Sequence, residues 1–225
     1  MNHKQSAMRP AAKLSFLIGL AIAGVILGGA SLLVAQAPAQ SAAPATAGAR
    51  LDVADGTTAS YRVQEQLAGI SFPNEAVGTT SAVTGTIVIA PDGSVNSAQS
   101  KLSIDARTIK SDQDMRDGYI QKRTLETDKF PTIDFVPKSI QGLPNPLPMN
   151  GQAGITLVGD MTVHGTTSPV TWNGIVTFAR DGSVAGRAST NFTFATFGLT
   201  KPSLARVLSV DDKIQLEVAF KFKRS

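Results

Sequence analysis

The chain has 225 residues, of which 42% are hydrophobic, and it contains no cysteine. Of its 21 basic residues, Lys4, Arg9 and Lys13 precede Arg50, which leaves 18 against 17 acidic residues in the rest of the chain. A nearly neutral domain lacks the excess of basic residues that is typical of a nucleic-acid-binding protein. The missing cysteine excludes disulfides and a lipoprotein anchor, so apolar packing must stabilise the fold.

Residues 1–35 resemble a targeting segment, because three basic residues precede an apolar run from Leu14 to Ala35. This run is longer than the apolar part of a cleaved signal peptide, about 7–15 residues, and suits a spanning helix of about 17–25 residues. Two small-x-small sites, Ala35-Gln36-Ala37 and Ala37-Pro38-Ala39, also allow cleavage, although Pro38 directly follows the first site. A signal peptide and a retained membrane anchor both remain open, and either predicts a periplasmic or otherwise extracytoplasmic domain.

Residues 36–50 are rich in Ala, Pro, Ser, Gln and Thr, a composition typical of a flexible linker. Residues 51–225 then suit a single domain with one core. Short runs with period-2 alternation recur along this domain between turn residues, which predicts an all-β fold. The clearest run is Lys213 to Lys223; the others are Tyr61–Glu65, Gly85–Ala90, Gln99–Asp105, Thr132–Lys138, Leu157–His164, Val170–Phe178 and Gly186–Phe194.

Two Asp-Gly pairs, at 92–93 and 181–182, separate alternating runs and predict hairpins between neighbouring strands. Three longer connections are expected at the ends of the sheet. Residues 110–130 are polar and predicted to be partly helical, residues 141–151 contain three prolines, and residues 198–208 precede the last strand.

One stretch, Gly159 to Val170, predicts a strand, a tight turn and the start of a second strand. Leu157, Met161 and Val163 share one face of the first strand, and Gly165 supplies the backbone freedom for the turn. His164 stands beside this turn without a His or Cys partner outside the first few residues. We therefore interpret it as a structural hydrogen-bonding residue rather than a catalytic base or metal ligand.

Three signatures occur in order along the chain: Arg116-Asp117 in a polar connection, Phe130-Pro131 leading into Ile133 and Phe135, and Thr162-Val163-His164-Gly165. In this ordered set the domain resembles the YceI-like family of lipocalin-like, polyisoprenoid-binding periplasmic proteins. The resemblance implies an eight-stranded antiparallel barrel with short helical connections that holds an isoprenoid chain in its interior. The sequence departs from the family pattern between Tyr61 and Gly85, where we interpret Glu65–Asn74 as an elaborated first connection.

An eight-stranded barrel is wide enough either to fill itself with side chains or to hold one small ligand. The resemblance favours a ligand, an isoprenoid quinone or polyprenyl lipid, whose polar head would sit at a rim formed by Tyr61, Arg116, Lys201 and Arg206. The inward-facing candidates for the apolar wall are Ile87, Ile89, Leu102, Ile104, Ile133, Phe135, Leu157, Met161, Val163, Trp172, Val176, Phe192, Phe194, Leu216, Val218 and Phe220.

The leading hypothesis is a non-enzymatic exported protein that stores or transports an isoprenoid lipid and needs no cofactor or metal. Its partners would be the lipid and, with an uncleaved leader, the membrane; a homodimer is left open. One rival is a structural module of the cell envelope with a filled barrel. Another is an isoprenoid-modifying enzyme with an inward acid such as Asp134 or Asp160, although the sequence lacks the usual hydrolase and nucleotide-binding motifs. Asp112 does not begin an EF-hand loop, because Asp117 and Arg123 occupy the positions of the required Gly and Glu.

Overall fold

The structure is a computed structural model that describes residues 48–69, 71–203 and 207–225. The predicted targeting segment, most of the predicted linker and Arg206 lie outside the described residues. Among the described residues, no helix has the length and hydropathy to cross a membrane.

Ten strand segments run through the described residues. In chain order they are β1 (Ala49–Val53), β2 (Thr58–Leu67), β3 (Asn74–Thr80), β4 (Val83–Ile89), β5 (Lys101–Asp105), β6 (Thr132–Gln141), β7 (Gly151–Val163), β8 (Thr166–Phe178), β9 (Ser183–Thr193) and β10 (Val207–Arg224). The helix α1 (Asp114–Tyr119) continues into a π-helical turn, Ile120–Thr124. Short 3₁₀ turns occupy Ser97–Gln99, Ala106–Thr108 and Phe194–Phe197.

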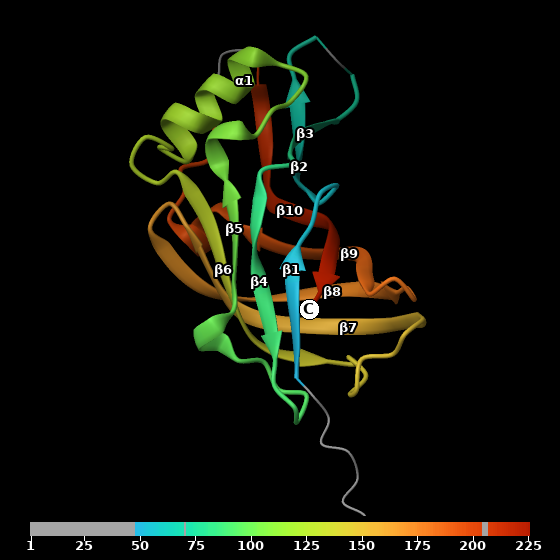
Figure 1. Cartoon of the computed structure of the whole chain (residues 1–225). Helices are drawn as coiled ribbons and strands as arrows, with labels where there is room; N and C mark the ends of the chain where they lie inside the picture. Colours follow the sequence, from blue (N-terminus) through green and yellow to red (C-terminus); the bar gives the residue numbers. More distant parts are fainter. Residues whose placement is uncertain (1–47, 70, 204–206) are drawn as a thin grey trace, which may run out of the picture. The chain divides into compact units, whose positions relative to one another are not determined.

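Antiparallel hydrogen bonding closes the sheet into a barrel, because β1 pairs with both β4 and β10 while β4 to β10 pair in succession. The strands β2 and β1 both pair with β10, one after the other along its length. On their other side, β2 pairs with β3 and β1 pairs with β4. Two interrupted strands, β1–β2 and β3–β4, therefore each occupy one position of the barrel (Figure 1). This arrangement confirms the predicted eight-stranded antiparallel barrel.

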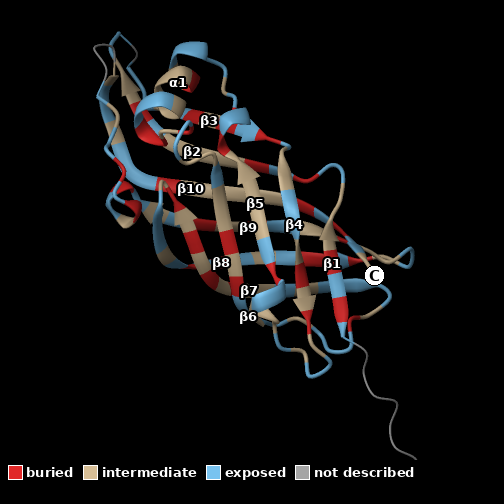
Figure 2. Cartoon of the chain, turned by 60° about the vertical axis from the view of Figure 1, so that its left-hand side comes forward, coloured by how far each residue is buried: buried red, intermediate tan, exposed pale blue. Residues whose placement is uncertain are grey.

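One face of each strand points into the barrel interior. Figure 2 shows this as an alternation of buried and exposed segments along the strands. On β10, Ile214, Phe220 and Phe222 are buried while Lys221 and Lys223 are exposed. This alternation is the one expected of a strand with one dry and one wet face.

Tight turns connect the predicted hairpins. Asp92 and Asp181 each accept hydrogen bonds from the backbone N–H and hydroxyl of the serine two residues later. The strands that flank these turns, β4 with β5 and β8 with β9, are neighbours as predicted. Between β7 and β8, His164 and Gly165 have φ angles of 51° and 74°, which is the geometry of a two-residue hairpin turn.

The structure differs from the sequence-based expectation in the bounds of several strands. The strand β1 begins at Ala49, so Ala49 and Arg50, which were placed in the linker, are paired with β4. The segment Glu65–Asn74, expected to be an elaborated connection, holds the end of β2, a short turn and the first residue of β3, which pairs with β2 as a hairpin. The last strand also begins at Val207, before the expected Lys213, and β9 ends at Thr193, before Phe194.

Candidate ligand cavity

The barrel encloses a cavity of about 870 Å³ at the end that carries α1. The inner faces of β2 and β3 contribute small residues to its wall, among them Ala59, Ala76 and Gly78. At Gly78 the Tyr61 ring packs so closely that a β-carbon would lie 2.3 Å from it. Small side chains on these two strands leave the space that larger ones would fill.

A second cavity of about 100 Å³ lies further inside the barrel. The two cavities share Ile104, Ile133, Trp172, Leu216 and Val218 as wall residues, so they adjoin one another at this ring of side chains. Together they form a mostly apolar chamber of the size typical of small-molecule sites, about 300–1,000 Å³.

The structure brings most of the predicted wall residues to these cavities. Besides the five shared residues, three predicted residues line only the larger cavity: Val163, Phe192 and Phe194. The smaller cavity alone is lined by Ile87, Leu102, Phe135, Leu157, Met161, Val176 and Phe220. Ile89 is buried beside Ala49 in the core and lines neither cavity.

Of the four residues expected at the rim, Tyr61 and Arg116 line the larger cavity. Lys201 is exposed and is not among its wall residues, although the neighbouring Pro202 is. Arg206 falls outside the described residues.

Apart from Arg116, the wall residues of the segment around α1 were not predicted from the sequence. Four wall residues of the larger cavity follow one another here at intervals of four: Asp112, Arg116, Ile120 and Thr124. Spacing of four residues places side chains on one face of a helix, so this pattern could have identified the segment as part of the wall. Exposed residues of the same segment, Met115, Lys122 and Arg123, also line the cavity, which therefore reaches solvent here.

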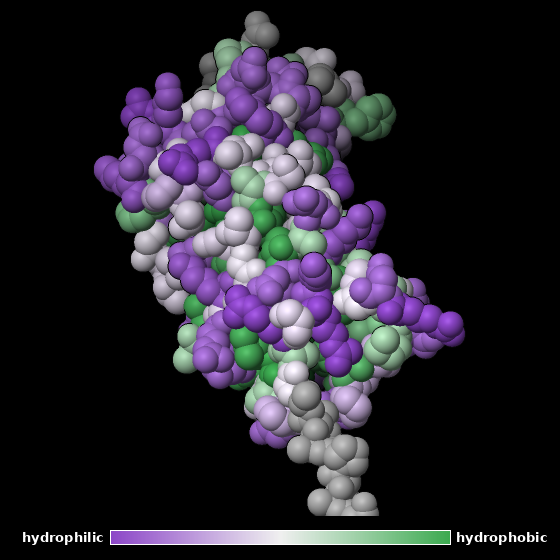
Figure 3. All heavy atoms as spheres, in the orientation of Figure 1, coloured by the Kyte–Doolittle hydropathy of each residue, from purple (hydrophilic) through white to green (hydrophobic). Residues whose placement is uncertain are grey.

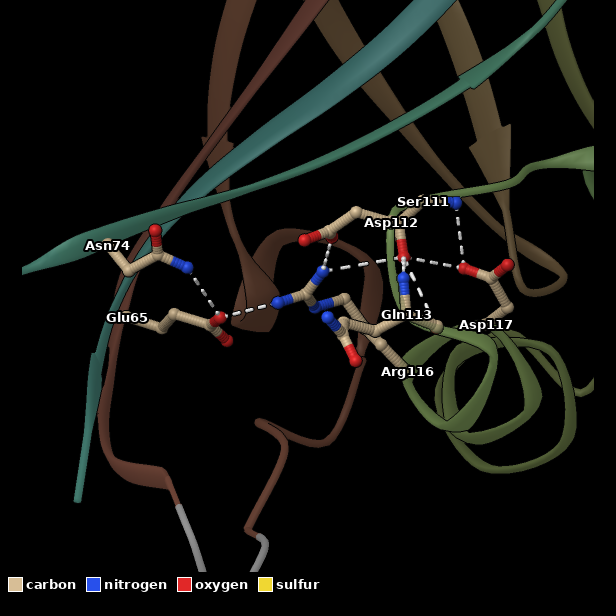
Figure 4. Close-up of polar contacts among 7 residues, drawn as sticks. All are labelled: Glu65, Asn74, Ser111, Asp112, Gln113, Arg116 and Asp117. Atoms are coloured by element: carbon tan, nitrogen blue, oxygen red, sulfur yellow. Dashed lines mark hydrogen bonds and ion pairs between the residues drawn. The ribbon is translucent and has the colours of Figure 1, made fainter. Parts of the chain in front are cut away.

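We call this opening the mouth; it is bounded by the α1 segment, the ends of β2 and β3, and the start of β10. Arg116 extends from α1 toward β2, where its Nη2 donates to Oε1 of Glu65 at 2.6 Å (Figure 4). Its Nη1 also pairs with Asp112, and Asn74 of β3 donates to Glu65 at 3.3 Å. Partial burial opposes the charge of Arg116, yet hydrogen bonds to Asp112 and Glu65 raise its pKa. This polar cluster ties the helical segment to the β2–β3 hairpin across the mouth.

The neighbouring residues Arg116 and Asp117 have separate partners. Asp117 is 3% exposed and its Oδ1 accepts hydrogen bonds from the backbone N–H and the hydroxyl of Ser111. Its other oxygen lies 3.6 Å from Nζ of Lys110. The Asp117 contacts therefore hold the entry to α1, while Arg116 holds α1 to the barrel (Figure 4).

Three polar atoms in the wall of the larger cavity are buried without a hydrogen-bond partner among the described residues. They are the Tyr61 hydroxyl, Oγ1 of Thr124 and Nε1 of Trp172. Burial raises the pKa of Tyr61 to about 12, so its phenol stays neutral at physiological pH. Unpaired buried polar groups are costly, so these three atoms destabilise the empty cavity wall.

The two acids considered for catalysis lie away from the cavities. Asp160 forms an ion pair with Lys138 at 2.6 Å, and neither Asp134 nor Asp160 is a wall residue. Partial burial opposes ionisation of Asp134, but hydrogen bonds from Ser103 and Lys101 lower its pKa. In the described ranges, His, Cys, Asp and Glu side chains form no group of three or more that could hold a metal ion.

Solved structures with the same fold provide an independent comparison. A polyisoprenoid binding domain from Saccharophagus degradans, implicated in plant cell wall breakdown, superposes with a TM-score of 0.61 at 11% identity, covering 79% of this chain and 98% of that one. BcnA of Burkholderia cenocepacia gives a TM-score of 0.53 at 15% identity, covering 73% of this chain and 95% of its own. No curated protein matches the chain in sequence. The model of the YceI-like domain matches residues 46–222, and the chain therefore belongs to the YceI-like family.

Proposed function

We propose that the protein binds an isoprenoid lipid in its barrel and stores or carries that lipid outside the cytoplasm, without catalysing a reaction on it. The observation that carries this proposal is the cavity of about 870 Å³, an apolar chamber with three unpaired polar atoms in its wall. Family membership and the name of the Saccharophagus degradans domain agree with it. The volume also argues against a barrel filled by its own side chains.

Apolar burial is large enough to hold such a ligand. Each buried methylene group contributes about 0.8 kcal/mol, so a chain of some tens of carbons gains on the order of 20 kcal/mol before costs. Association costs of about 4–15 kcal/mol reduce this sum, and micromolar to nanomolar affinity is the expected result.

The polar atoms of the wall favour an uncharged head group. Trp172 donates only, and the neutral Tyr61 phenol can also donate, so a carbonyl or hydroxyl oxygen would satisfy them once a small shift of these buried side chains brings them against the ligand. Arg116 already pairs with two carboxylates, which leaves it poorly placed to neutralise a phosphate. We therefore favour a quinone-like lipid over a polyprenyl phosphate.

The test is mass spectrometry of organic extracts from the full chain, purified after export in a bacterial host and compared with a mock purification. Ala76→Phe fills the larger cavity from β3, whereas Val77→Phe adds the same ring to the adjacent position, which does not line it. We expect a stoichiometric isoprenoid in the wild type and in Val77→Phe, and a severalfold loss in Ala76→Phe.

The single tryptophan supplies a second readout, because Trp172 lines both cavities. A soluble short-chain quinone should quench its fluorescence in the wild type and in Val77→Phe and should do so weakly in Ala76→Phe. A folded wild type that yields no isoprenoid and shows no quenching contradicts the proposal.

A further inference from the structure

Exposed apolar side chains gather around the mouth of the barrel. Among the described residues, five large hydrophobic side chains are more than half exposed, and three of them, Phe72 (79%), Met115 (84%) and Leu208 (67%), belong to this end. Met115 lines the cavity itself, on α1. These three residues are called the rim triad below.

The strand pairing places the other two members of the rim triad beside the mouth. Phe72 lies in the turn between β2 and β3. The last residue of β2, Leu67, and the first residue of β3, Asn74, both line the cavity. Leu208 follows Val207, which pairs with Leu67. In Figure 1 the β2–β3 turn and α1 lie at the same end of the barrel, and Figure 3 shows apolar spheres reaching the surface there among hydrophilic ones.

Two exposed cations belong to the wall at this end. Lys122 and Arg123 are exposed, line the mouth and have no ion pair among the described residues. The acids Glu65 and Asp112 are paired with Arg116, while Asp114, Asp211 and Asp212 contribute opposing charge. Apolar contact is therefore the main attraction that this surface offers, with a smaller electrostatic contribution from the two cations.

We propose that the mouth docks onto the surface of a phospholipid bilayer, with the rim triad inserted among the lipids and Lys122 and Arg123 against their phosphates. The inference rests on the proposed function, because a lipid that is dissolved in a membrane must leave it through an opening that touches the membrane. The interfacial region of a bilayer accepts apolar side chains flanked by cations. A mouth that contacts the bilayer directly can transfer the ligand without exposing its isoprenoid chain to water.

The test uses the absence of cysteine from the chain. Single variants Phe72→Cys, Met115→Cys and Leu208→Cys are made in the full chain and labelled with an environment-sensitive dye. Met149→Cys and Ile175→Cys are the matched controls, because these residues are 60% and 58% exposed but lie in the β6–β7 connection and on the outer face of β8. Every variant keeps the same N-terminal segment, so differences between sites report the barrel alone.

Vesicles of phosphatidylcholine, and of an equimolar mixture with phosphatidylglycerol, are added without any isoprenoid. We expect a blue shift of the dye at the three rim positions and none at the two controls. In unlabelled protein with Lys122 and Arg123 both changed to Gln, the rate of quinone transfer from the anionic vesicles should fall by about three- to tenfold. The same change at Arg180 and Lys223, two exposed cations of the opposite end, should leave the rate unchanged.

Equal dye response at rim and control positions overturns the docking proposal. A response that appears on raising protein concentration without vesicles also overturns it, since it shows contact between protein copies. Ligand loading is measured separately by extraction: docking without loading rejects the proposed function alone, and loading without a rim response rejects docking alone.

Discussion

Tyr61 places an unpaired buried hydroxyl in the cavity wall, at a cost to the stability of the empty protein. Its ring packs over Gly78, and its hydroxyl is buried without a partner among the described residues. A hydroxyl in such a position destabilises the fold until another group satisfies it. Its position in the cavity wall makes sense if the ligand supplies an acceptor.

Replacing Tyr61 by Phe should change the response of the protein to alkaline pH. Burial raises the pKa of Tyr61 from 10.0 to about 12, so its contribution to stability is present below pH 10.0 and is lost as the pH approaches 12. Denaturant titrations across this range should show a smaller loss of unfolding free energy in Tyr61→Phe than in the wild type. Tyr119→Phe, which removes the only other tyrosine, is the control; equal pH dependence in all three proteins would contradict the assignment.

At the residue scale, sequence reasoning predicted Tyr61 and Arg116 near the ligand because of the family resemblance. It could not reveal that Arg116 is already paired, since Glu65 is 51 residues away in the chain and reaches Arg116 only through the fold. Ile89 was placed in the wall by alternation alone, which identifies the inner face of a strand but not whether that part of the interior is hollow.

A buried ion pair ties the α1 segment to the barrel, in addition to the core packing of Ile120 and Leu125. The side chains of Arg116 and Glu65 are only 14% and 8% exposed, and they join α1 to β2. Losing one partner from such a pair leaves an uncompensated charge, whereas replacing both with apolar residues is often nearly neutral.

A double-mutant cycle tests this account. Arg116→Met should lower the unfolding free energy by about 3–5 kcal/mol, because Glu65 is left buried and charged. Glu65→Leu should cost less, since Arg116 retains Asp112, and the double variant should recover most of the loss. The exposed pair Arg62–Glu75, 2.7 Å apart on the neighbouring surface of β2 and β3, is the control, with an expected effect under about 1 kcal/mol. Additive losses in the Arg116 cycle would show that the two residues act independently.

At the element scale, β3 was missed for a physical reason. Its inward residues are Ala76, Gly78 and Thr80, and these small side chains face the cavity instead of filling it. A strand beside an empty space lacks the large apolar residues that make alternation visible. The hairpins marked by Asp-Gly were predicted correctly because turn chemistry is local and does not depend on what the strands enclose.

On the scale of the whole molecule, the short strand β1 closes the barrel. It pairs with β10 through three residues and with β4 through four, and it buries Ala49 and Leu51. Composition predicted a linker up to residue 50 because Ala and Gly carry little strand signal. The antiparallel barrel was predictable from patterns repeated along the chain, whereas the cavity volume depends on which side chains meet across it.

Removing β1 should open the barrel. A chain that starts at Gly48 should unfold in one cooperative thermal transition, while a chain that starts at Ala54 should melt at lower temperature and aggregate, because the edges of β4 and β10 lose their partner. Calorimetry with light scattering measures both effects. Indistinguishable melting of the two proteins would mean that β1 contributes little to closure.

The pairing of β1 with β10 also brings the two ends of the barrel sequence together. The backbone N–H of Arg50 donates to the carbonyl of Ser225 at 3.2 Å, and that of Ser225 donates to Arg50 at 3.0 Å. Such adjacency suits circular permutation: a short peptide can join these ends, and new ends can be cut at an exposed turn such as Asp92-Gly93. The same geometry would let a fusion partner or an immobilising tag be attached through Ser225 without adding any residue at the α1 end.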